Sequence, residues 1–200
     1  MKSQLLISME VDNVKEGIKT AARDLFRRYG YHKTSVIEIA KRAKIAKATI
    51  YKYFDSKEVL LHTILMDYIR NSVHELIHNA PEELSEEAYL SDLILKTSRL
   101  SYTVCNEFIG WEFIRESANS QEFLKALSDD LEQLLIQSFN EAPLFQNTSN
   151  YSGRLRFLIK ASKSIIFSFA FTSVSDSDVR KNFISFQKEI LPYLVKAAIK

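Results

Sequence analysis

Glycine and proline are scarce in this chain, and their scarcity constrains the fold more than any other feature. Only 4 Gly and 3 Pro occur among 200 residues, whereas 46% of the residues are hydrophobic. A turn-rich all-β fold needs many such residues, so the composition favours long helices joined by short links. Helical spacing of apolar residues then predicts an all-α protein of about nine helices. We place them near residues 14–29, 35–43, 46–53, 57–78, 86–104, 107–118, 121–140, 153–173 and 176–198.

Capping residues mark the ends of the first helices. Three pairs have the spacing of a capping box, in which a side chain at the helix start and one three residues later exchange hydrogen bonds. These pairs are Asn13 with Glu16, Ser35 with Glu38, and Asp55 (next to Ser56) with Glu58. Gly30 stands where a left-handed residue ends a helix. The sequence therefore predicts a three-helix head followed by a long fourth helix.

The second and third helices form a helix-turn-helix. Two short helices joined by a tight turn at 44–45 match this motif. Ala40 is small where the helices cross, and Ile50 and Phe54 are placed to lock the second helix against the first. The remaining positions mix cations, hydroxyls and a small residue, which suits a helix lying in the major groove of DNA. These outward positions are Lys47, Ala48, Thr49, Tyr51, Lys52 and Tyr53.

Charge is distributed unevenly along the chain. Residues 1–60 carry 13 Lys and Arg against 7 Asp and Glu, whereas residues 61–200 carry 14 against 18. A basic head on an acidic body is the pattern of a phosphate-binding module joined to a regulatory domain. We therefore expect a DNA-binding domain over residues 1–58 and a regulatory domain over 59–200.

Several observations favour a cytoplasmic protein. The single cysteine, Cys105, excludes an internal disulfide framework and fits a reducing compartment. The first twelve residues are too short and too charged for a signal peptide, and no apolar stretch is long enough for a membrane span. No membrane partner is expected.

The head also resembles a known family. The segments that carry the resemblance are Ala21-Ala22-Arg23-Asp24-Leu25-Phe26, Gly30-Tyr31, Thr34-Ser35-Val36, Ile39-Ala40, Ala43, Thr49-Ile50-Tyr51-Lys52-Tyr53-Phe54, Ser56-Lys57-Glu58 and Leu60. In order and spacing they resemble the DNA-binding domain of TetR-family transcriptional regulators, over roughly residues 13–65. The rest of the chain resembles that family only in length and helical character.

The resemblance implies a homodimer that binds a palindromic site on double-stranded DNA. It implies phosphate contacts from Thr34, Ser35 and Lys57, backbone clamps from Lys47, Tyr51 and Tyr53, and base-edge contacts from Ala48, Thr49 and Lys52. At three positions the chain departs from the family pattern. Lys44 replaces a turn glycine, Ala46 replaces a capping Ser or Thr, and Ala48 replaces a helix glycine. The first two changes each cost on the order of 1 kcal/mol.

The resemblance implies that residues 59–200 form an effector-binding and dimerisation domain. The resemblance implies an effector cavity, which we place near Tyr102, Phe108, Trp111 and Phe139, although aromatic residues at helical spacing are more often core. Residues 155–172 are apolar or small on nearly every face, and the final helix has one apolar stripe, which predicts a four-helix interface with a second copy. Its expected residues are Leu158, Ser162, Ile165, Phe169, Phe183, Phe186, Ile190 and Leu194.

A rival motif is His74-Glu75-Leu76-Ile77-His78, which matches the zinc-protease pattern H-E-x-x-H. No third ligand is placed at the spacing that such proteases use, so we favour two histidines near a helix end and leave an incidental metal site open.

The sequence therefore predicts no enzyme and no cofactor. We expect a repressor released from its operator by a small apolar or aromatic molecule. The alternative is a ligand-independent DNA-bound factor that recruits a protein partner, and a zinc-dependent hydrolase is remote.

Overall fold

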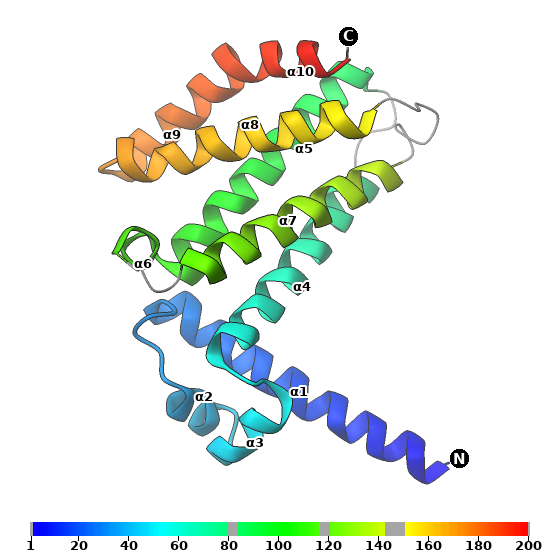
Figure 1. Ribbon diagram of the computed structural model, residues 1–200, viewed down its shortest axis with the longest axis vertical. Coiled ribbons are helices and arrows are strands. Elements are labelled where there is room, and N and C mark those ends of the chain that lie inside the picture. Colours follow the sequence, from blue (N-terminus) through cyan, green and yellow to red (C-terminus); the bar gives the residue numbers. More distant parts are fainter. Residues whose placement is uncertain (1, 80–83, 117–120, 143–150, 200) are drawn as a thin grey trace. The chain divides into compact units, whose positions relative to one another are not determined.

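The computed structural model describes residues 2–79, 84–116, 121–142 and 151–199. Within these ranges the chain is helical and has no strand, which confirms the predicted all-α class (Figure 1). The α-helices are α1 (Lys2–Tyr29), α2 (Val36–Arg42), α3 (Lys47–Tyr53), α4 (Lys57–His78), α5 (Glu86–Thr103), α6 (Trp111–Glu116), α7 (Gln121–Glu141), α8 (Tyr151–Thr172), α9 (Asp176–Ser185) and α10 (Leu191–Ile199). Two π-helical segments, Val104–Ile109 and Phe186–Ile190, follow α5 and α9. None of the described helices combines the length and the apolar character needed to cross a membrane.

Two compact units make up the chain. The first contains residues 1–67 and 104–123, and the second contains residues 68–103 and 124–200. The predicted division at residue 58 concerns where DNA and effector bind, so it stays a prediction.

The first unit is organised around α1. Ile18, Ala22 and Phe26 are buried at helical spacing, and α1 packs against α2. Gly30 ends the helix as predicted, with a φ of 82° and its amide donating to the Phe26 carbonyl at 2.8 Å. The predicted start at Asn13 is wrong. Because residues 2–12 contain neither glycine nor proline, the helix continues upstream through that position.

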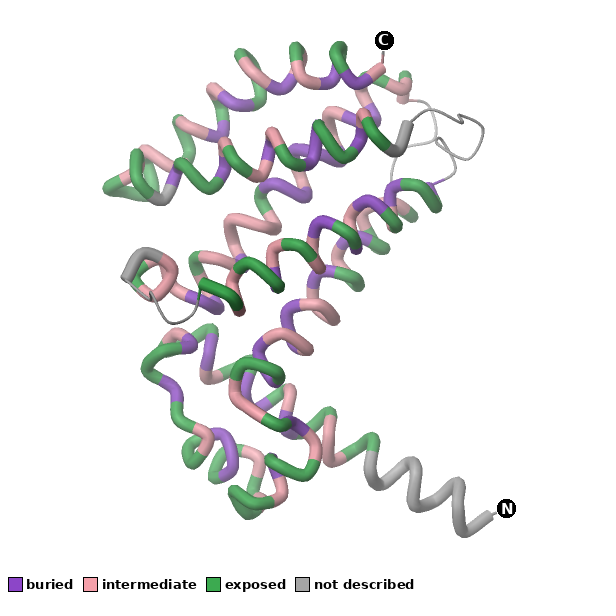
Figure 2. The backbone as a smooth tube through the Cα atoms, viewed as in Figure 1, coloured by how far each residue is buried: buried purple, intermediate pink, exposed green. Residues whose placement is uncertain are grey.

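The second unit is built on apolar packing among α5, α8 and α10. Buried residues recur along these helices at helical spacing (Figure 2). They include Leu90, Leu93, Ile94, Leu155, Leu158, Leu191 and Val195. The predicted loop at 142–152 lies largely outside the described residues, and α8 begins at Tyr151.

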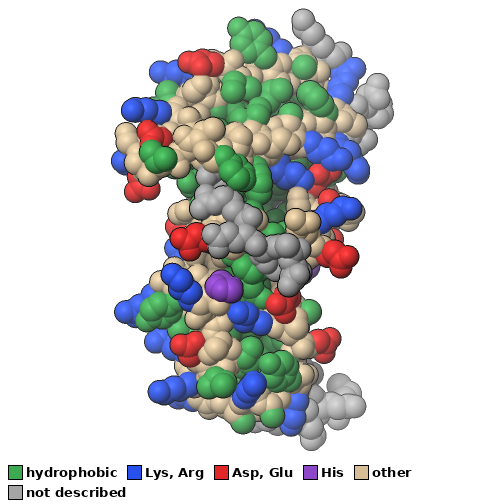
Figure 3. Space-filling model, turned by 60° about the vertical axis from the view of Figure 1, so that its left-hand side comes forward, with side chains coloured by type: hydrophobic (Ala, Val, Ile, Leu, Met, Phe, Trp, Pro, Cys, Tyr) green, Lys and Arg blue, Asp and Glu red, His purple; other side chains and the backbone are tan. Residues whose placement is uncertain are grey.

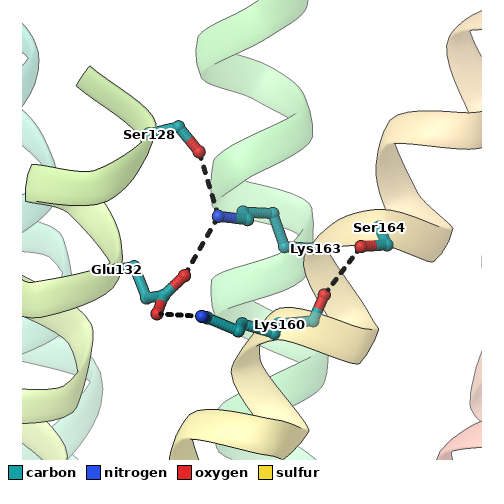
Figure 4. Close-up of polar contacts among 5 residues, drawn as sticks. All are labelled: Ser128, Glu132, Lys160, Lys163 and Ser164. Carbon is teal, nitrogen blue, oxygen red and sulfur yellow. Dashed lines mark hydrogen bonds and ion pairs between the residues drawn. The ribbon is translucent and has the colours of Figure 1, made fainter. Parts of the chain in front are cut away.

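One buried carboxylate interrupts this apolar packing. Glu132 of α7 has a side chain only 8% exposed, and two lysines of α8 approach its two oxygens (Figure 4). Lys163 Nζ lies 3.1 Å from Oε2 and also donates to the Ser128 hydroxyl at 2.9 Å, while Lys160 Nζ lies 3.5 Å from Oε1. These charges join α7 to α8.

Candidate nucleic-acid interface

Helix α2 begins with the predicted capping box. The Glu38 amide donates to the Ser35 hydroxyl at 3.2 Å, and the Ser35 amide donates to the Glu38 carboxylate at 2.8 Å. This backbone hydrogen bond from Ser35, together with the one from its hydroxyl, lowers the pKa of Glu38. The box fixes where the first helix of the motif starts.

The turn between α2 and α3 carries the strain that the departures from the family pattern predict. Lys44 has a φ of 57°, the left-handed conformation that glycine adopts without strain. The Ile45 amide donates to the Ala40 carbonyl at 3.0 Å, which closes the turn. Ala46 begins α3 without a side-chain cap, as its methyl group requires.

Helix α3 presents a mixed polar face to solvent. Ile50 and Phe54 are buried as predicted and hold the helix on the unit. Lys47, Ala48, Tyr51 and Lys52 are exposed, whereas Thr49 and Tyr53 are half-buried. Lys47 Nζ lies 5.8 Å from the centre of the Tyr51 ring, so a cation and a hydroxyl-bearing ring stand together on the exposed face.

The residues before α2 point inward more than the sequence indicates. Thr34 is only 3% exposed, and its hydroxyl donates to the Gly30 carbonyl at 2.9 Å. The hydroxyl to which the sequence assigns a phosphate contact therefore holds the end of α1. The Ser35 hydroxyl is exposed but serves the capping box.

Lys57 also turns toward the protein. Its Nζ donates to the Tyr31 carbonyl at 3.0 Å and to the Thr34 carbonyl at 2.9 Å, and it lies 4.1 Å from the centre of the Tyr31 ring. Burial lowers the pKa of Lys57, against the opposing effect of the neighbouring Glu58 carboxylate.

Of the residues predicted to cap α4, Ser56 is the cap, because its hydroxyl accepts a hydrogen bond from the Val59 amide at 3.2 Å. The Glu58 carboxylate accepts a hydrogen bond from the Tyr31 hydroxyl at 2.6 Å and another from the Ser56 side chain. The contact with Tyr31 contributes most to the lowered pKa of the carboxylate. Burial and this same contact raise the pKa of the Tyr31 phenol.

Residues 104–113 extend this network within the first unit. The Tyr31 amide donates to the Phe108 carbonyl at 3.0 Å, and the Tyr31 ring meets Phe113 edge-on at 5.2 Å. Arg27 donates to the Glu107 carboxylate through Nε at 3.1 Å and through a terminal nitrogen at 2.7 Å. Sequence reasoning missed Tyr31 and Arg27 as organising residues, because their partners lie far away in the chain: Glu58 is 27 residues from Tyr31, and Glu107 is 80 residues from Arg27.

The histidine motif lies on the exposed part of α4. The rings of His74 and His78 stack with centroids 3.8 Å apart and an interplanar angle of 24°. His78 Nδ1 lies 2.9 Å from the His74 carbonyl oxygen. Ring nitrogens bind metals in the plane of the ring, so stacked rings do not converge on one ion. Among the described residues no group of three or more His, Cys, Asp or Glu side chains could hold a metal.

The residues predicted to line an effector cavity are distributed over both units. Phe108 and Trp111 belong to the first unit, and Tyr102 and Phe139 belong to the second. Phe108 and Phe139 are fully buried, and Tyr102 meets Phe183 edge-on at 5.7 Å. A groove of about 420 Å³ lies between α4 and α5 of the second unit. Its lining is Ser72, Glu75, Leu76, Asn79, Lys96, Arg99 and Leu100.

Cys105 lies in the first π-helical segment. Burial raises the pKa of its thiol to about 12, so the thiol stays protonated at neutral pH.

The residues predicted for the dimer interface face mainly into the chain itself. Leu158, Ser162, Phe169, Phe183 and Phe186 are buried within the single chain. Ile165, Ile190 and Leu194 are half-buried.

Other apolar residues of the same helices are exposed instead. On α8 these are Phe157, Phe167 and Phe171, the last of them 63% exposed, and on the last helices they are Ile184 and Tyr193. Figure 3 shows exposed hydrophobic side chains among basic ones on one face of the molecule. The periodicity of a helix that is apolar all round cannot tell its inward face from its outward face.

The fold and the exposed α3 face define a helix-turn-helix protein. Residues 18–64 match the family model for bacterial regulatory proteins of the tetR family. The predicted resemblance is therefore confirmed: the chain carries the N-terminal domain of the TetR family.

Relatives of known sequence match over part of the chain. The HTH-type transcriptional regulator YuxN of Bacillus subtilis (strain 168) is 53% identical over 51 residues, which are 26% of this chain and 17% of YuxN. The match thus spans less than a fifth of that relative's length.

Solved structures match over most of the chain. A TetR transcriptional regulator from Rhodococcus sp. RHA1 has a TM-score of 0.64 at 18% identity and covers 94% of this chain and 96% of its own. The regulator FadR of Bacillus subtilis, solved with stearoyl-CoA, has a TM-score of 0.56 at 19% identity and covers 91% of this chain and 98% of its own. At these identities the likeness shows a shared fold.

Proposed function

We propose that this chain is a ligand-responsive, DNA-binding transcriptional regulator that represses from a palindromic operator. The observation that carries the proposal is the exposed face of α3, where Lys47, Ala48, Tyr51 and Lys52 stand on a helix fixed from below by Ile50. Exposed cations bind phosphates, and small and hydroxyl-bearing residues suit base edges in a major groove. Half-buried Thr49 and Tyr53 flank this face.

We propose homodimerisation through the exposed apolar residues of the second unit. Phe167 and Phe171 lie one turn apart on α8, with ring centroids 6.1 Å apart, and Phe157 is exposed ten residues earlier on the same helix. Exposed apolar side chains of this kind on a helix stabilise association with a second copy. Two heads held by such a dimer read half-sites one helical turn apart.

We propose that the second unit, which contains Tyr102 and Phe139, binds a small, largely apolar effector. The related FadR structure contains stearoyl-CoA, an amphipathic molecule with a long apolar chain. Such an effector lowers DNA affinity only by its preference for the conformation that does not fit the operator.

The DNA proposal is tested by selection from a genomic-fragment library. The purified wild type and a Lys47→Ala/Tyr51→Ala variant are each bound to the library over a salt series. We expect the wild type to select a palindromic site and the variant to lose that selection while keeping the wild-type melting temperature. Equal selection by both proteins would exclude α3 as the reading helix.

The dimer proposal is tested by sedimentation. Phe167→Glu/Phe171→Glu places charges on the exposed α8 face and is expected to give a monomer at micromolar concentration. Val174→Glu is the matched control, because Val174 is 98% exposed just beyond α8. A variant that remains dimeric would place the interface elsewhere.

The effector proposal is tested with long-chain acyl compounds and small aromatics as probes. We expect at least one to raise the melting temperature and to release the selected DNA. If no probe changes either property, the ligand-independent alternative gains support.

A further inference from the structure

Tyr31 lies where three parts of the first unit meet. Its amide donates to the Phe108 carbonyl, its carbonyl accepts from Lys57, and its hydroxyl donates to Glu58. We propose that Lys57 is a positioning residue, which acts through Tyr31 and Thr34 to hold the segment that leads into α2, and that it is not a phosphate contact. This inference rests on the DNA-binding function proposed above and reassigns one residue of the predicted DNA interface.

The surroundings of the Lys57 ammonium support this role. An ammonium group has three donors, and two of them are directed at the carbonyls of Tyr31 and Thr34, at 3.0 and 2.9 Å. The face of the Tyr31 ring lies 4.1 Å from the same nitrogen and adds a cation–π contact. A DNA phosphate could engage only the remaining donor unless the ammonium gave up one of these contacts.

The two carbonyls lie in the short segment that sets the position of α2. This segment starts at Gly30, which ends α1, and finishes at Ser35, which caps α2. Thr34 is also fixed by its hydroxyl on the Gly30 carbonyl. Lys57, at the first position of α4, thus ties this segment to the start of the fourth helix, alongside the hydrogen bond from the Tyr31 hydroxyl to Glu58.

A displacement of the segment would move the reading helix. Helix α2 packs against α3, and Ile39 and Ile50 are both buried. Removal of the Lys57 ammonium takes one donor from each of the two carbonyls; the Tyr31 carbonyl keeps the hydrogen bond from the Thr34 amide, but unmade hydrogen bonds in a partly buried site are costly. We therefore expect its removal to alter the orientation of α3 without removing any charge that faces DNA.

The salt dependence of DNA binding distinguishes the two roles. Each phosphate contact contributes about 0.9 to the slope of log affinity against log salt concentration, between about 50 and about 200 mM salt. The full-length variants Lys57→Met and Lys47→Met are measured on a duplex that carries the selected site. We expect Lys57→Met to weaken binding about tenfold, the effect of one charged hydrogen bond, at every salt concentration and with the wild-type slope. We expect Lys47→Met to reduce the slope by about 0.9 for each phosphate that the protein no longer neutralises.

Two outcomes overturn the proposal. A slope that falls in Lys57→Met as it does in Lys47→Met would identify Lys57 as a phosphate contact. Unchanged affinity together with an unchanged slope would mean that Lys57 neither binds a DNA phosphate nor positions the segment that leads into α2.

Amide hydrogen exchange tests the same role without DNA. The Thr34 amide donates to the Tyr31 carbonyl at 3.3 Å, within the segment that Lys57 holds. Lys57→Met is expected to speed exchange over residues 31–36 about tenfold, whereas Lys47→Met is expected to leave it unchanged. Lys57→Gln, which keeps one donor, is expected to be intermediate and serves if Lys57→Met does not fold.

Hydrogen exchange and DNA selection test different claims, so either claim can be overturned without the other. Wild-type exchange rates in Lys57→Met would overturn the positioning role even if the protein selects DNA. Absence of selective DNA binding by the wild type would overturn the proposed function, while the exchange data would still decide what Lys57 does to the segment.

Discussion

The head and the second unit keep their structures by different means. In the head, residues 18–64 combine a buried apolar core with directional contacts such as the Ser35–Glu38 capping box and the Tyr31–Glu58 hydrogen bond. In the second unit, α5, α8 and α10 are joined mainly by interchangeable apolar side chains. The family model matches only the head, whereas the fold matches over 94% of the chain at 18% identity. Directional contacts restrict which residues can occupy a position, while apolar packing restricts mainly volume and pattern.

The largest expected effect tests the apolar packing of the second unit. Phe186 is fully buried, so Phe186→Ala should lower the free energy of unfolding by about 3 to 5 kcal/mol. Val174→Ala is the control, because Val174 is 98% exposed and its truncation should stay within about 0.5 kcal/mol. Urea unfolding at one fixed protein concentration measures both. If Phe186→Ala lowers the free energy of unfolding by less than about 1 kcal/mol, apolar packing is not what mainly stabilises the second unit.

In the second unit, the ion pairs of Glu132 with Lys160 and Lys163 are directional contacts within a region joined mainly by apolar side chains. Lys163→Met leaves the Glu132 carboxylate without its closer lysine and should cost about 2 kcal/mol, below the range for fully buried pairs because Lys163 is partly exposed. Lys160→Met is the matched control. The Lys160 side chain is 55% exposed and 3.5 Å from the carboxylate, so its removal should cost under about 1 kcal/mol. Equal losses in the same urea titration would show that Lys163 has no special role.

The head and the second unit each contain a helix capped by a serine, so the same substitution can be compared in both. Ser35 caps α2 and Ser175 caps α9, and each hydroxyl accepts a backbone amide at 3.2 Å. Each change to alanine should cost about 1 kcal/mol of unfolding free energy. Only Ser35→Ala should also weaken DNA binding, because only α2 positions the reading helix. Weaker DNA binding by Ser175→Ala at equal dimer content would contradict that separation.

The same division explains which features the sequence predicts. Short-range rules correctly predicted the capping box at Ser35 and the left-handed Gly30, because both partners lie within one helical turn. The inward ammonium of Lys57 depends on carbonyls more than twenty residues away, and no local pattern indicates it. Along α8 the apolar pattern located the helix but not its outward face, because Phe169 and Phe171 are equally apolar and differ only in what packs against them.

The smallest expected effect concerns the hydrogen bond from the Tyr31 hydroxyl to Glu58, whose contribution to stability should depend on pH. The pKa of Glu58 is lowered in the folded state, chiefly by the hydrogen bond from the Tyr31 hydroxyl. A lowered carboxyl pKa contributes stability that is present above the unfolded-state value of about 4.3 and is lost as the pH falls through the folded-state value. Tyr31→Phe removes the hydroxyl donor and should therefore be less stable than the wild type at pH 7 by under about 1 kcal/mol.

The difference between wild type and Tyr31→Phe should shrink as the pH falls below the unfolded-state value of about 4.3 and then through the lowered folded-state pKa of Glu58, because the carboxylate becomes protonated in both states. Urea titrations of the two proteins at neutral and acidic pH measure it, and Glu58→Gln is expected to show the same loss of pH dependence. A difference that stays constant with pH would mean that the Tyr31 hydroxyl stabilises the head without acting through the Glu58 charge. The contact would then be one of packing, and this part of the head would resemble the second unit.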